Sequence, residues 1–523
     1  MQNLNDEWFK AYEKSRLLWD NKSYDEAKEV LEIFWKKTGI KTLPQMVLYA
    51  YILRSQKKYI TLINFLEETL KVFKNAKELN FLATLYSLWG ESCQRIGKGK
   101  IAAEKFLKSA EFELDASKKL REISNAIFAR GASDFSPEEM DFFYKKYRDT
   151  LNELNIIPYK KRKHNRKKIR IGYLSGDLHS HPVADFSGAL FLDYSKDKFE
   201  IYVYNLGNFN DEVTKILKSG GSVWRDVFNF NFDKIAQTIY NDEIDILVDL
   251  SGHTKNNALP VFKYKPVPVQ LSGMGYVLST GLYETDGFLT DIYASPNENS
   301  PYFTEKLFRL YHTHFCYTPF KNFPKVLPPP CLKNNYITFG SFNNFSKVTD
   351  EVLTLWIEIL TAVPNSKITL KHSIFDSEEG LNSTKNRIKS LGGNLEKFEF
   401  RGFGENYLFE YNDIDIALDT FPYNGGATSL EAMMMGVPIV TLKGDRHGSR
   451  FGVSFLNNLN LSELIGENKS NYVEIAKILA NDRELISILR KNLRGKMLSS
   501  PLMNRNEYME ELEDLYEKLT SPL

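Results

Sequence analysis

Residues 413–442 read DIDIALDTFPYNGGATSLEAMMMGVPIVTL, and this pattern decides the expected fold. Apolar side chains at positions 414, 416 and 418 predict a short strand buried in a parallel sheet. A glycine-rich turn follows, and a helix is expected to begin near Thr428. The apolar run 439–442 predicts the next buried strand. The stretch therefore forms a strand–turn–helix–strand unit, which is typical of an α/β domain.

The turn of this unit places polar groups at the start of the helix. Gly425 and Gly426 allow the backbone to approach a ligand closely, and Thr428 and Ser429 add two hydroxyls. Free amides at a helix N-terminus suit a diphosphate. Glu431 lies about one turn further, within reach of the hydroxyls of an attached ribose. Ordinary strand-to-helix turns outnumber phosphate sites, so the turn alone favours a simple helix cap.

A family resemblance changes this balance. The stretch resembles the nucleotide-sugar end of the O-GlcNAc transferase and SPINDLY family, which carries LDTFPYNGxTTSxEALWMGVPVVTL-like sequence here. Ala427 stands where that family has the first of two threonines. One hydroxyl contact to phosphate is thereby lost, while the backbone amide remains available.

The length and composition of the chain limit the classes of protein to which it can belong. A chain of 523 residues is long enough for about three domains. The net charge of +1 gives no drive toward nucleic acid, and no signal peptide or membrane span is expected. Three widely spaced cysteines argue against a disulfide framework or zinc site and suit a reducing, cytoplasmic location.

Residues 1–159 predict an all-α domain with tetratricopeptide-like helices and a connector. Second helices of hairpins are expected to open near Tyr24, Tyr59 and Gly99, giving two or three degenerate repeats. Their concave face would hold an extended protein segment, or the helices would brace the enzyme or form a homo-oligomer. The basic run 159–168 is interpreted as a linker.

Residues 168–319 predict an N-terminal Rossmann-like lobe. Strands are expected at 169–175, 199–204, 244–250, 269–274 and 287–293, with helices at 211–218 and 234–241 between them. Ligands of such sheets gather beyond the carboxyl ends of the strands, where His181 and His253 both fall. Histidine is well suited to move a proton near neutral pH, so both are candidate catalytic residues.

The resemblance extends over this lobe. GYLSGDLHSHPVADF and DLSGHT resemble the bacterial members, and this implies that His181 is a base or a contact to the sugar and α-phosphate. His253 is the second choice for the base. The segment 277–279 reads VLS where the family has Pro-Gly-Thr, which leaves the preference for sugar or peptide open.

Residues 334–500 predict the C-terminal Rossmann-like lobe, which binds the nucleotide sugar, and residues 501–523 a C-terminal helix that crosses back to the first lobe. The segment FNNFSK resembles the family's FNxxxK, which implies that Lys347 contacts the donor diphosphate and acts in catalysis, with Asn343 and Asn344 beside it. A leaving diphosphate needs positive charge, which agrees with this assignment.

Three further residues of this lobe are candidate nucleotide contacts. By resemblance Tyr407, in a helix expected to open at 405–411, stacks on the base with Phe403 nearby, although Tyr407 could equally belong to the core. Arg450 follows the last strand and would support either a phosphate or a carboxylate. Asp413 and Asp415 have the spacing of a metal motif but enter a buried strand, so no metal and no cofactor are expected.

The expected fold is thus α/β, with two facing Rossmann-like lobes of the GT-B type preceded by an all-α helical-repeat domain. The resemblance implies a bacterial, metal-independent, inverting protein O-GlcNAc transferase that moves a sugar from a UDP donor to Ser or Thr hydroxyls. Flagellin or a surface adhesin is a candidate acceptor. The alternatives are another donor or acceptor (GDP-fucose, or UDP-glucose to Asn), a non-catalytic nucleotide-sugar-binding protein, or an interaction scaffold built on the helical repeats.

Overall fold

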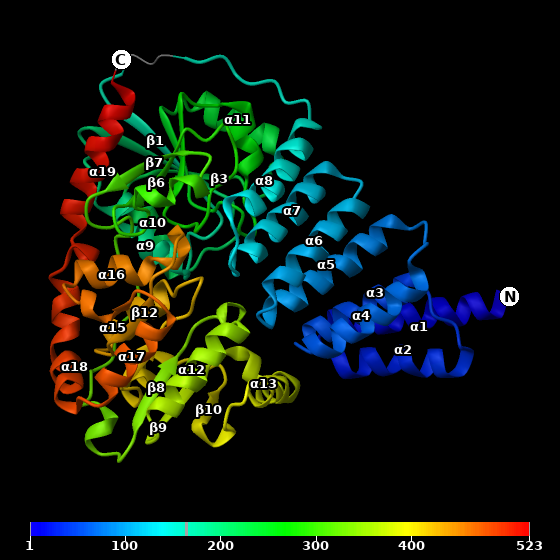
Figure 1. Cartoon of the computed structure of the whole chain (residues 1–523). Coiled ribbons are helices and arrows are strands. Elements are labelled where there is room, and N and C mark those ends of the chain that lie inside the picture. Colours follow the sequence, from blue (N-terminus) through cyan, green and yellow to red (C-terminus); the bar gives the residue numbers. More distant parts are fainter. Residues whose placement is uncertain (1, 163–165, 522–523) are drawn as a thin grey trace.

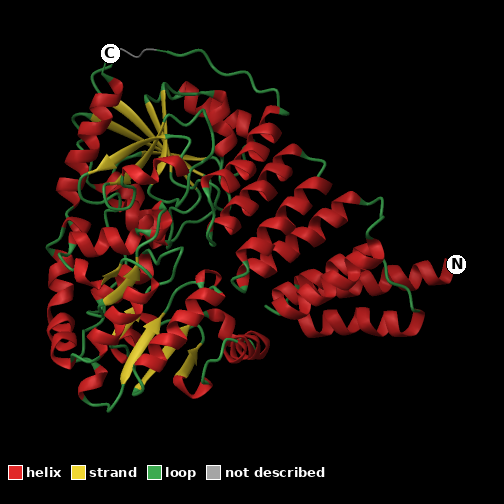
Figure 2. Ribbon diagram, viewed as in Figure 1, coloured by secondary structure: helices red, strands yellow, loops and turns green. Residues whose placement is uncertain are grey.

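The computed structural model describes residues 2–162 and 166–521, and it has three parts (Figure 1). An arm of paired helices leads into two α/β lobes, and each lobe has its own parallel sheet (Figure 2). Residues 163–165 of the predicted linker lie outside the described ranges. None of the helices within those ranges is long and apolar enough to cross a bilayer.

The arm consists of antiparallel helices, which form four successive pairs in the described part of the chain. Apolar residues at helical spacing face one another, so that Leu31, Leu62 and Leu66 are fully buried. The predicted openings of the second helices are confirmed, but four pairs form where two or three repeats were expected. The helices are α1 (Gln2–Asp20), α2 (Tyr24–Thr38), α3 (Leu43–Ser55), α4 (Tyr59–Phe73), α5 (Leu79–Arg95), α6 (Gly99–Phe112), α7 (Ala116–Gly131) and α8 (Pro137–Asn152).

The first lobe is built on a seven-stranded parallel sheet with the order β3-β2-β1-β4-β5-β6-β7. The edge strands β3 and β7 were not predicted, because both carry charged residues and are only partly buried. The strands are β1 (Ile169–Ser175), β2 (Phe199–Asn205), β3 (Val223–Asp226), β4 (Ile246–Asp249), β5 (Val269–Gly273), β6 (Gly287–Asp291) and β7 (Lys306–Leu310). The helices are α9 (Pro182–Leu192), α10 (Glu212–Ser219) and α11 (Phe232–Asn241).

The second lobe has a six-stranded parallel sheet with the order β10-β9-β8-β11-β12-β13. The predicted helix at 405–411 is shorter than expected, since only one α-helical turn forms there. The strands are β8 (Ile337–Ser341), β9 (Ser366–Lys371), β10 (Phe398–Arg401), β11 (Ile416–Leu418), β12 (Ile439–Leu442) and β13 (Ile465–Gly466). The helices are α12 (Asp350–Ala362), α13 (Glu378–Ser390), α14 (Tyr407–Glu410), α15 (Ala427–Met434), α16 (Phe451–Asn458), α17 (Lys469–Ala480) and α18 (Arg483–Leu498).

The last helix, α19 (Arg505–Thr520), returns to the first lobe, as predicted. It runs along the outer edge of the molecule in Figure 1. Tyr508, Leu512 and Tyr516 are buried in the core of the first lobe, and the hydroxyls of Tyr516 and Tyr173 lie 3.2 Å apart. This helix therefore ties the end of the chain to the start of the first sheet.

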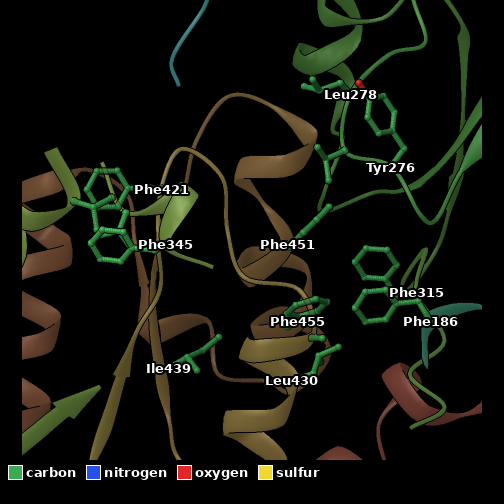
Figure 3. Packing of buried hydrophobic residues seen from close by; sticks show 14 of the residues in the cluster. Phe186, Tyr276, Leu278, Phe315, Phe345, Phe421, Leu430, Ile439, Phe451 and Phe455 are labelled. Carbon is green, nitrogen blue, oxygen red and sulfur yellow. The ribbon is translucent and has the colours of Figure 1, made fainter. Parts of the chain in front are cut away.

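Aromatic packing joins the two lobes. Phe186 of α9 stacks on Phe315 with ring centroids 4.3 Å apart, and Phe315 meets Phe451 of α16 edge-on at 5.0 Å (Figure 3). Phe455 lies beside them on the same helix. Such a closely packed aromatic contact fixes how the two lobes face each other.

The helical arm contacts both lobes. The carboxylate of Glu379 on α13 accepts hydrogen bonds from the amides of Ile60, at 2.7 Å, and Thr61, at 3.2 Å, at the start of α4. On the other side, the hydroxyl of Ser124 on α7 lies 2.9 Å from Nδ1 of His253 in the first lobe. The arm is therefore held on both lobes.

Candidate active site

The carboxyl ends of β8 and β11 bring Lys347 and the glycine-rich turn together. The two strands are neighbours in the sheet, so the segments that follow them meet at one edge. Lys347 Nζ donates to the carbonyl of Asn424 at 2.8 Å and lies 3.7 Å from the ring centroid of Tyr423. The hydroxyl of Thr428 donates to Oδ1 of Asn343 at 2.8 Å. Three of the predicted donor contacts thus share one corner of the second lobe.

Lys347 is half-buried, and burial lowers its pKa to about 8. The nearby carboxylate of Asp419 opposes this shift by favouring the charged ammonium. A lysine held in this way has lost part of its hydration, so an incoming phosphate gains more from it than from a solvated lysine.

Asp419, which the sequence analysis did not single out, organises the turn. Its Oδ1 accepts from the amides of Gly425 at 2.7 Å and Thr420 at 2.9 Å, and its Oδ2 accepts from the hydroxyl of Thr441 at 2.8 Å. Burial raises the pKa of Asp419 to about 6, against the effect of these hydrogen bonds. A single buried carboxylate therefore folds the turn back onto the end of β11.

The open amides at the start of α15 differ from those expected. The amide of Gly425 is occupied by Asp419, so it is not free for a diphosphate as predicted. Within the described residues, the amides of Gly426, Ala427 and Thr428 have no acceptor. Ser429 also turns its hydroxyl toward Asp419, at 3.4 Å. The helix N-terminus thus offers three amides to an anion, one residue further along than predicted.

Gly425 has no room for a side chain. A Cβ at this position would lie 2.3 Å from the hydroxyl oxygen of Ser429 and 2.8 Å from that of Thr428. Glycine is needed here because the turn passes directly against the first turn of α15.

The residues predicted at the ribose and base end also come together. Glu431 is buried, and its Oε1 accepts from the hydroxyl of Tyr407 at 2.7 Å and from Nζ of Lys321 at 2.7 Å. Burial raises the pKa of Glu431. Phe403 lies nearby in the chain and is 75% exposed, which leaves its ring available to a ligand.

His181 caps helix α9. Its Nδ1 accepts from the amide of Val183 at 3.3 Å, so the neutral ring carries its hydrogen on Nε2. Burial lowers the pKa of His181, which keeps the ring neutral. In this tautomer Nε2 donates a hydrogen bond, which suits a contact to the donor and does not suit a base acting through Nε2. The same helix packs Phe186 against Gly426 at the start of α15, because a Cβ on Gly426 would lie 3.3 Å from that ring.

His253 is held between the arm and the first lobe. Its Nδ1 lies 2.9 Å from the hydroxyl of Ser124, and its Nε2 lies 2.8 Å from the carbonyl of Thr280. Burial lowers its pKa to about 4. Both ring nitrogens already have partners in the chain, so this arrangement favours a structural part for His253 over the predicted second choice of base.

Arg450 joins the lobes through backbone carbonyls and pairs with no carboxylate of the described residues, whereas its predicted contact with a phosphate stays a prediction. Its Nε donates to the carbonyl of Tyr293 in the first lobe at 2.8 Å, and its Nη1 donates to the carbonyl of Gly444 in the second at 3.0 Å. Burial lowers the pKa of Arg450. The side chain therefore links the two lobes.

The segment 277–279 is also structural in its contacts. A Cβ on Gly131 of α7 would lie 2.5 Å from the side chain of Leu278, and one on Gly448 would lie 3.1 Å from Val277. Ser279 donates to the carboxylate of Glu305 at 2.6 Å. The departure from the family pattern thus lies at the junction of the arm and the two lobes.

A cavity of about 600 Å³ lies between the arm and the lobes. Helices α3, α5 and α7 of the arm supply one wall, and Asn344 and Ser346, next to Lys347, lie on the other. Hydroxyl, carboxamide and paired charged groups line most of it, including Gln94, Ser117, Asn125, Thr254, Asn256 and Asn257. The cavity therefore lies between the face of the helical arm and the segment that carries Lys347.

Asp413 and Asp415, which have the spacing of a metal motif, bind other groups of the protein. Asp413 pairs with Arg401 at 2.8 Å, and Asp415 accepts from the amides of Cys331 at 2.9 Å and Thr338 at 2.8 Å. Among the residues that the structure describes, no cluster of three or more His, Cys, Asp or Glu side chains could hold a metal ion.

The model of the family described as glycosyl transferase family 41 matches residues 148–328 and 330–512. The chain belongs to glycosyl transferase family 41. The match covers both lobes and the site between them, so the family 41 assignment rests on the same residues as the geometry above.

Relatives of this family 41 chain include SPINDLY of Arabidopsis thaliana, named as a probable UDP-N-acetylglucosamine–peptide N-acetylglucosaminyltransferase. It is 37% identical over 361 residues, which are 68% of this chain and 39% of SPINDLY. The protein SEC of the same plant, named likewise, is 29% identical over 69% of this chain and 38% of its own length. The chain thus spans about two fifths of the length of these relatives.

The O-GlcNAc transferase of Thermobaculum terrenum, solved as a mutant with one lysine changed to methionine, has the same organisation. Its TM-score to this chain is 0.84 at 25% identity, and the superposition covers 99% of this chain and 98% of that one. The two-lobed GT-B architecture with its preceding helical repeats is therefore confirmed.

Proposed function

We propose that this chain is an inverting glycosyltransferase that moves N-acetylglucosamine from UDP to Ser or Thr hydroxyls of a protein. The observation that carries the proposal is the corner formed by Lys347 and the three open amides at the start of α15. This corner presents a cation and a helix N-terminus to one point, which suits the charge of a departing diphosphate. The names of the relatives support UDP-N-acetylglucosamine as the donor.

The groups around this corner divide the work of the reaction. The acceptor hydroxyl attacks the anomeric carbon as the bond from that carbon to the diphosphate oxygen breaks. The hydroxyl proton passes to the departing diphosphate, and Lys347 and the amides of α15 take up its remaining negative charge. His181 donates from Nε2 to the sugar or the α-phosphate. Glu431 accepts from the ribose hydroxyls, and Tyr407 lies against the base. Because lysine and amides neutralise the leaving group, the reaction is proposed to need no divalent ion.

The acceptor is proposed to be an extended protein segment lying in the cavity between the arm and the lobes. Hydroxyl and carboxamide groups along its walls can bond to a peptide backbone. Three buried free cysteines agree with action in the cytoplasm. Flagellin or a surface adhesin is proposed as the first acceptor to test. The chain is also proposed to form a homo-oligomer through the outer helices of the arm.

The test is transfer by the purified chain. Co-expressed candidate acceptors are analysed by mass spectrometry, which gives the added mass and the modified residue together. Lys347→Ala should abolish transfer and weaken UDP binding while the unfolding temperature is kept. Lys397→Ala is the matched control, because Lys397 also donates to backbone carbonyls, those of Leu360 and Pro364, but at the amino end of β10. Near-normal turnover of Lys347→Ala contradicts the proposal.

Two other donors belong in the same assay. Ala427 departs from the family pattern at the start of α15, and the segment 277–279 departs from it at the junction of the arm and the lobes, so GDP-fucose and UDP-glucose are compared with UDP-N-acetylglucosamine. A preference for either would keep the transferase assignment and change the sugar.

A further inference from the structure

Lys321 lies in the segment that crosses from the first lobe to the second, and it binds one carboxylate on each. Its Nζ is 3.0 Å from Oδ2 of Asp185 on α9 and 2.7 Å from Oε1 of Glu431 on α15. The two carboxylates are almost fully buried, while the lysine side chain is 30% exposed. A single ammonium group therefore bridges the two helices that border the donor corner.

The crossing segment is fixed to α9 by its backbone. The amide of Thr318 donates to the carbonyl of Asp185 at 2.6 Å, and the amide of Phe320 donates to Oδ1 of the same residue at 3.2 Å. The amide of Cys316 adds a bond to the carbonyl of Phe186 at 3.3 Å. Lys321 is thus held in place on the first lobe and reaches out to the second.

The two bridged helices carry the groups that meet the donor. Asp185 lies in the first turn of α9, directly after its cap His181, and Glu431 lies about one turn into α15, after the open amides. A change in the separation of these helices would move His181 relative to the amides that hold the diphosphate. The bridge is therefore placed to set that distance.

The charges around the bridge add a second effect. Without Lys321, two buried carboxylates would face each other beside the site of an anionic diphosphate, and like charges in a poorly solvated place repel strongly. The hydroxyl of Tyr407 donates to Glu431, and the hydroxyl of Tyr317 also lies near both carboxylates. Burial, which alone would lower the pKa of Lys321, is outweighed by Glu431 and Asp185, so the pKa is raised and the ammonium stays charged.

We propose that Lys321 is a positioning residue for the nucleotide-sugar donor: by bridging Asp185 and Glu431 it sets the spacing of α9 and α15 and reduces the repulsion between the two carboxylates. This inference rests on the proposed function, because it takes the start of α15 as the diphosphate site. The sequence offered no sign of it, since Asp185 and Glu431 are 246 positions apart and meet only through the fold.

The experiment measures the Kd for UDP by calorimetry and kcat and KM for the donor in the full-length chain. Lys321→Met should raise the Kd and the KM at least tenfold, and Lys321→Arg should restore them to within about threefold of wild type. Lys263→Met is the matched control, because Lys263 is similarly exposed and binds the single carboxylate of Glu284 at 2.7 Å, away from the donor corner. It should leave both constants unchanged.

A second variant separates positioning from packing. Lys321→Met combined with Asp185→Asn removes one of the two facing carboxylates, so it should recover part of the lost UDP affinity; a lysine that only packs would give no recovery. Wild-type affinity in Lys321→Met overturns the inference, and so does a loss that neither Lys321→Arg nor the double variant relieves. A wild-type chain that binds no UDP would refute the proposed function itself, and the inference with it.

Discussion

Replacing Asp419 by asparagine should raise the stability of the second lobe and weaken its binding of UDP. The carboxylate is buried and its pKa is raised from 3.8 to about 6, so the folded chain prefers its neutral form. The stabilising contribution of such a group is complete below pH 3.8 and is lost as the pH rises through 6. At pH 7 the charged carboxylate therefore costs about 3 kcal/mol, from roughly 2.2 units at 1.36 kcal/mol each.

Asparagine removes this cost and keeps an oxygen for two of the donors. Its carbonyl can still accept from the amides of Gly425 and Thr420, so the turn should keep its shape. Alanine at position 419 also removes the charge, but it leaves two buried amides without an acceptor, at about 1–3 kcal/mol each. We therefore expect Asp419→Asn to be more stable than Asp419→Ala by about 2–6 kcal/mol.

Binding should change in the opposite direction. Asp419 is the group that favours the charged form of Lys347, so its loss lowers the pKa of that lysine below 8. Fewer molecules then carry the ammonium that meets a diphosphate at pH 8. The assays are urea unfolding at pH 7 and calorimetry with UDP at pH 8. An Asp419→Asn chain that is clearly less stable than wild type, or that binds UDP equally well at pH 8, would refute the reasoning.

Three further predictions concern the site and its support. Binding of UDP should weaken about tenfold between pH 7 and pH 9, because the protonated fraction of Lys347 falls about tenfold over this range when its pKa is near 8. Calorimetry with UDP across this pH range measures the effect. The variant Lys347→Arg should remove the pH dependence. His181→Asn should keep the cap on α9, since asparagine also caps helices, yet it should lower kcat by about 100-fold because the Nε2 hydrogen bond is lost. Unchanged kcat in a stably folded variant would speak against a contact between His181 and the nucleotide sugar. His253 has a pKa near 4 in the folded chain and 6.5 in the unfolded chain, so its contribution to stability is complete above pH 6.5 and is lost as the pH falls through 4. At pH 5 the loss should be about 2 kcal/mol, which urea unfolding of wild type and His253→Gln at pH 7 and pH 5 measures. An equal loss of stability in the two proteins would contradict the structural part assigned to His253.

Much of the fold could be predicted because its strands are short apolar runs between glycine-rich turns. Strands such as β1 and β12 are largely buried, so their sequences are mostly apolar. The edge strands β3 and β7 were missed, since an edge strand keeps charged residues and so lacks this pattern. The predicted number of helical pairs in the arm was also too low, because the spacing between degenerate repeats varies.

The site could be predicted less completely. Lys347 and the start of α15 were placed together because both follow strands and resemble a family motif. The roles of Asp419, Lys321 and Arg450 depend on contacts between segments that meet only through the fold. Arg450 was a candidate from sequence, but its backbone partners could not be predicted. Asp419 in particular reads as the end of a strand, although its carboxylate decides which amides of the turn remain open.

The contacts of the helical arm with both lobes also bear on the form of the proposed protein acceptor. With Glu379 of the second lobe bound to α4 and Ser124 of α7 facing His253 of the first lobe, the arm and the lobes border a cavity of about 600 Å³. If the acceptor lies in this cavity, as proposed, a flexible segment would enter it and a rigid domain would not. Proteins would then be sorted by whether they can thread a loose loop or a free terminus into it, before any side chain is compared.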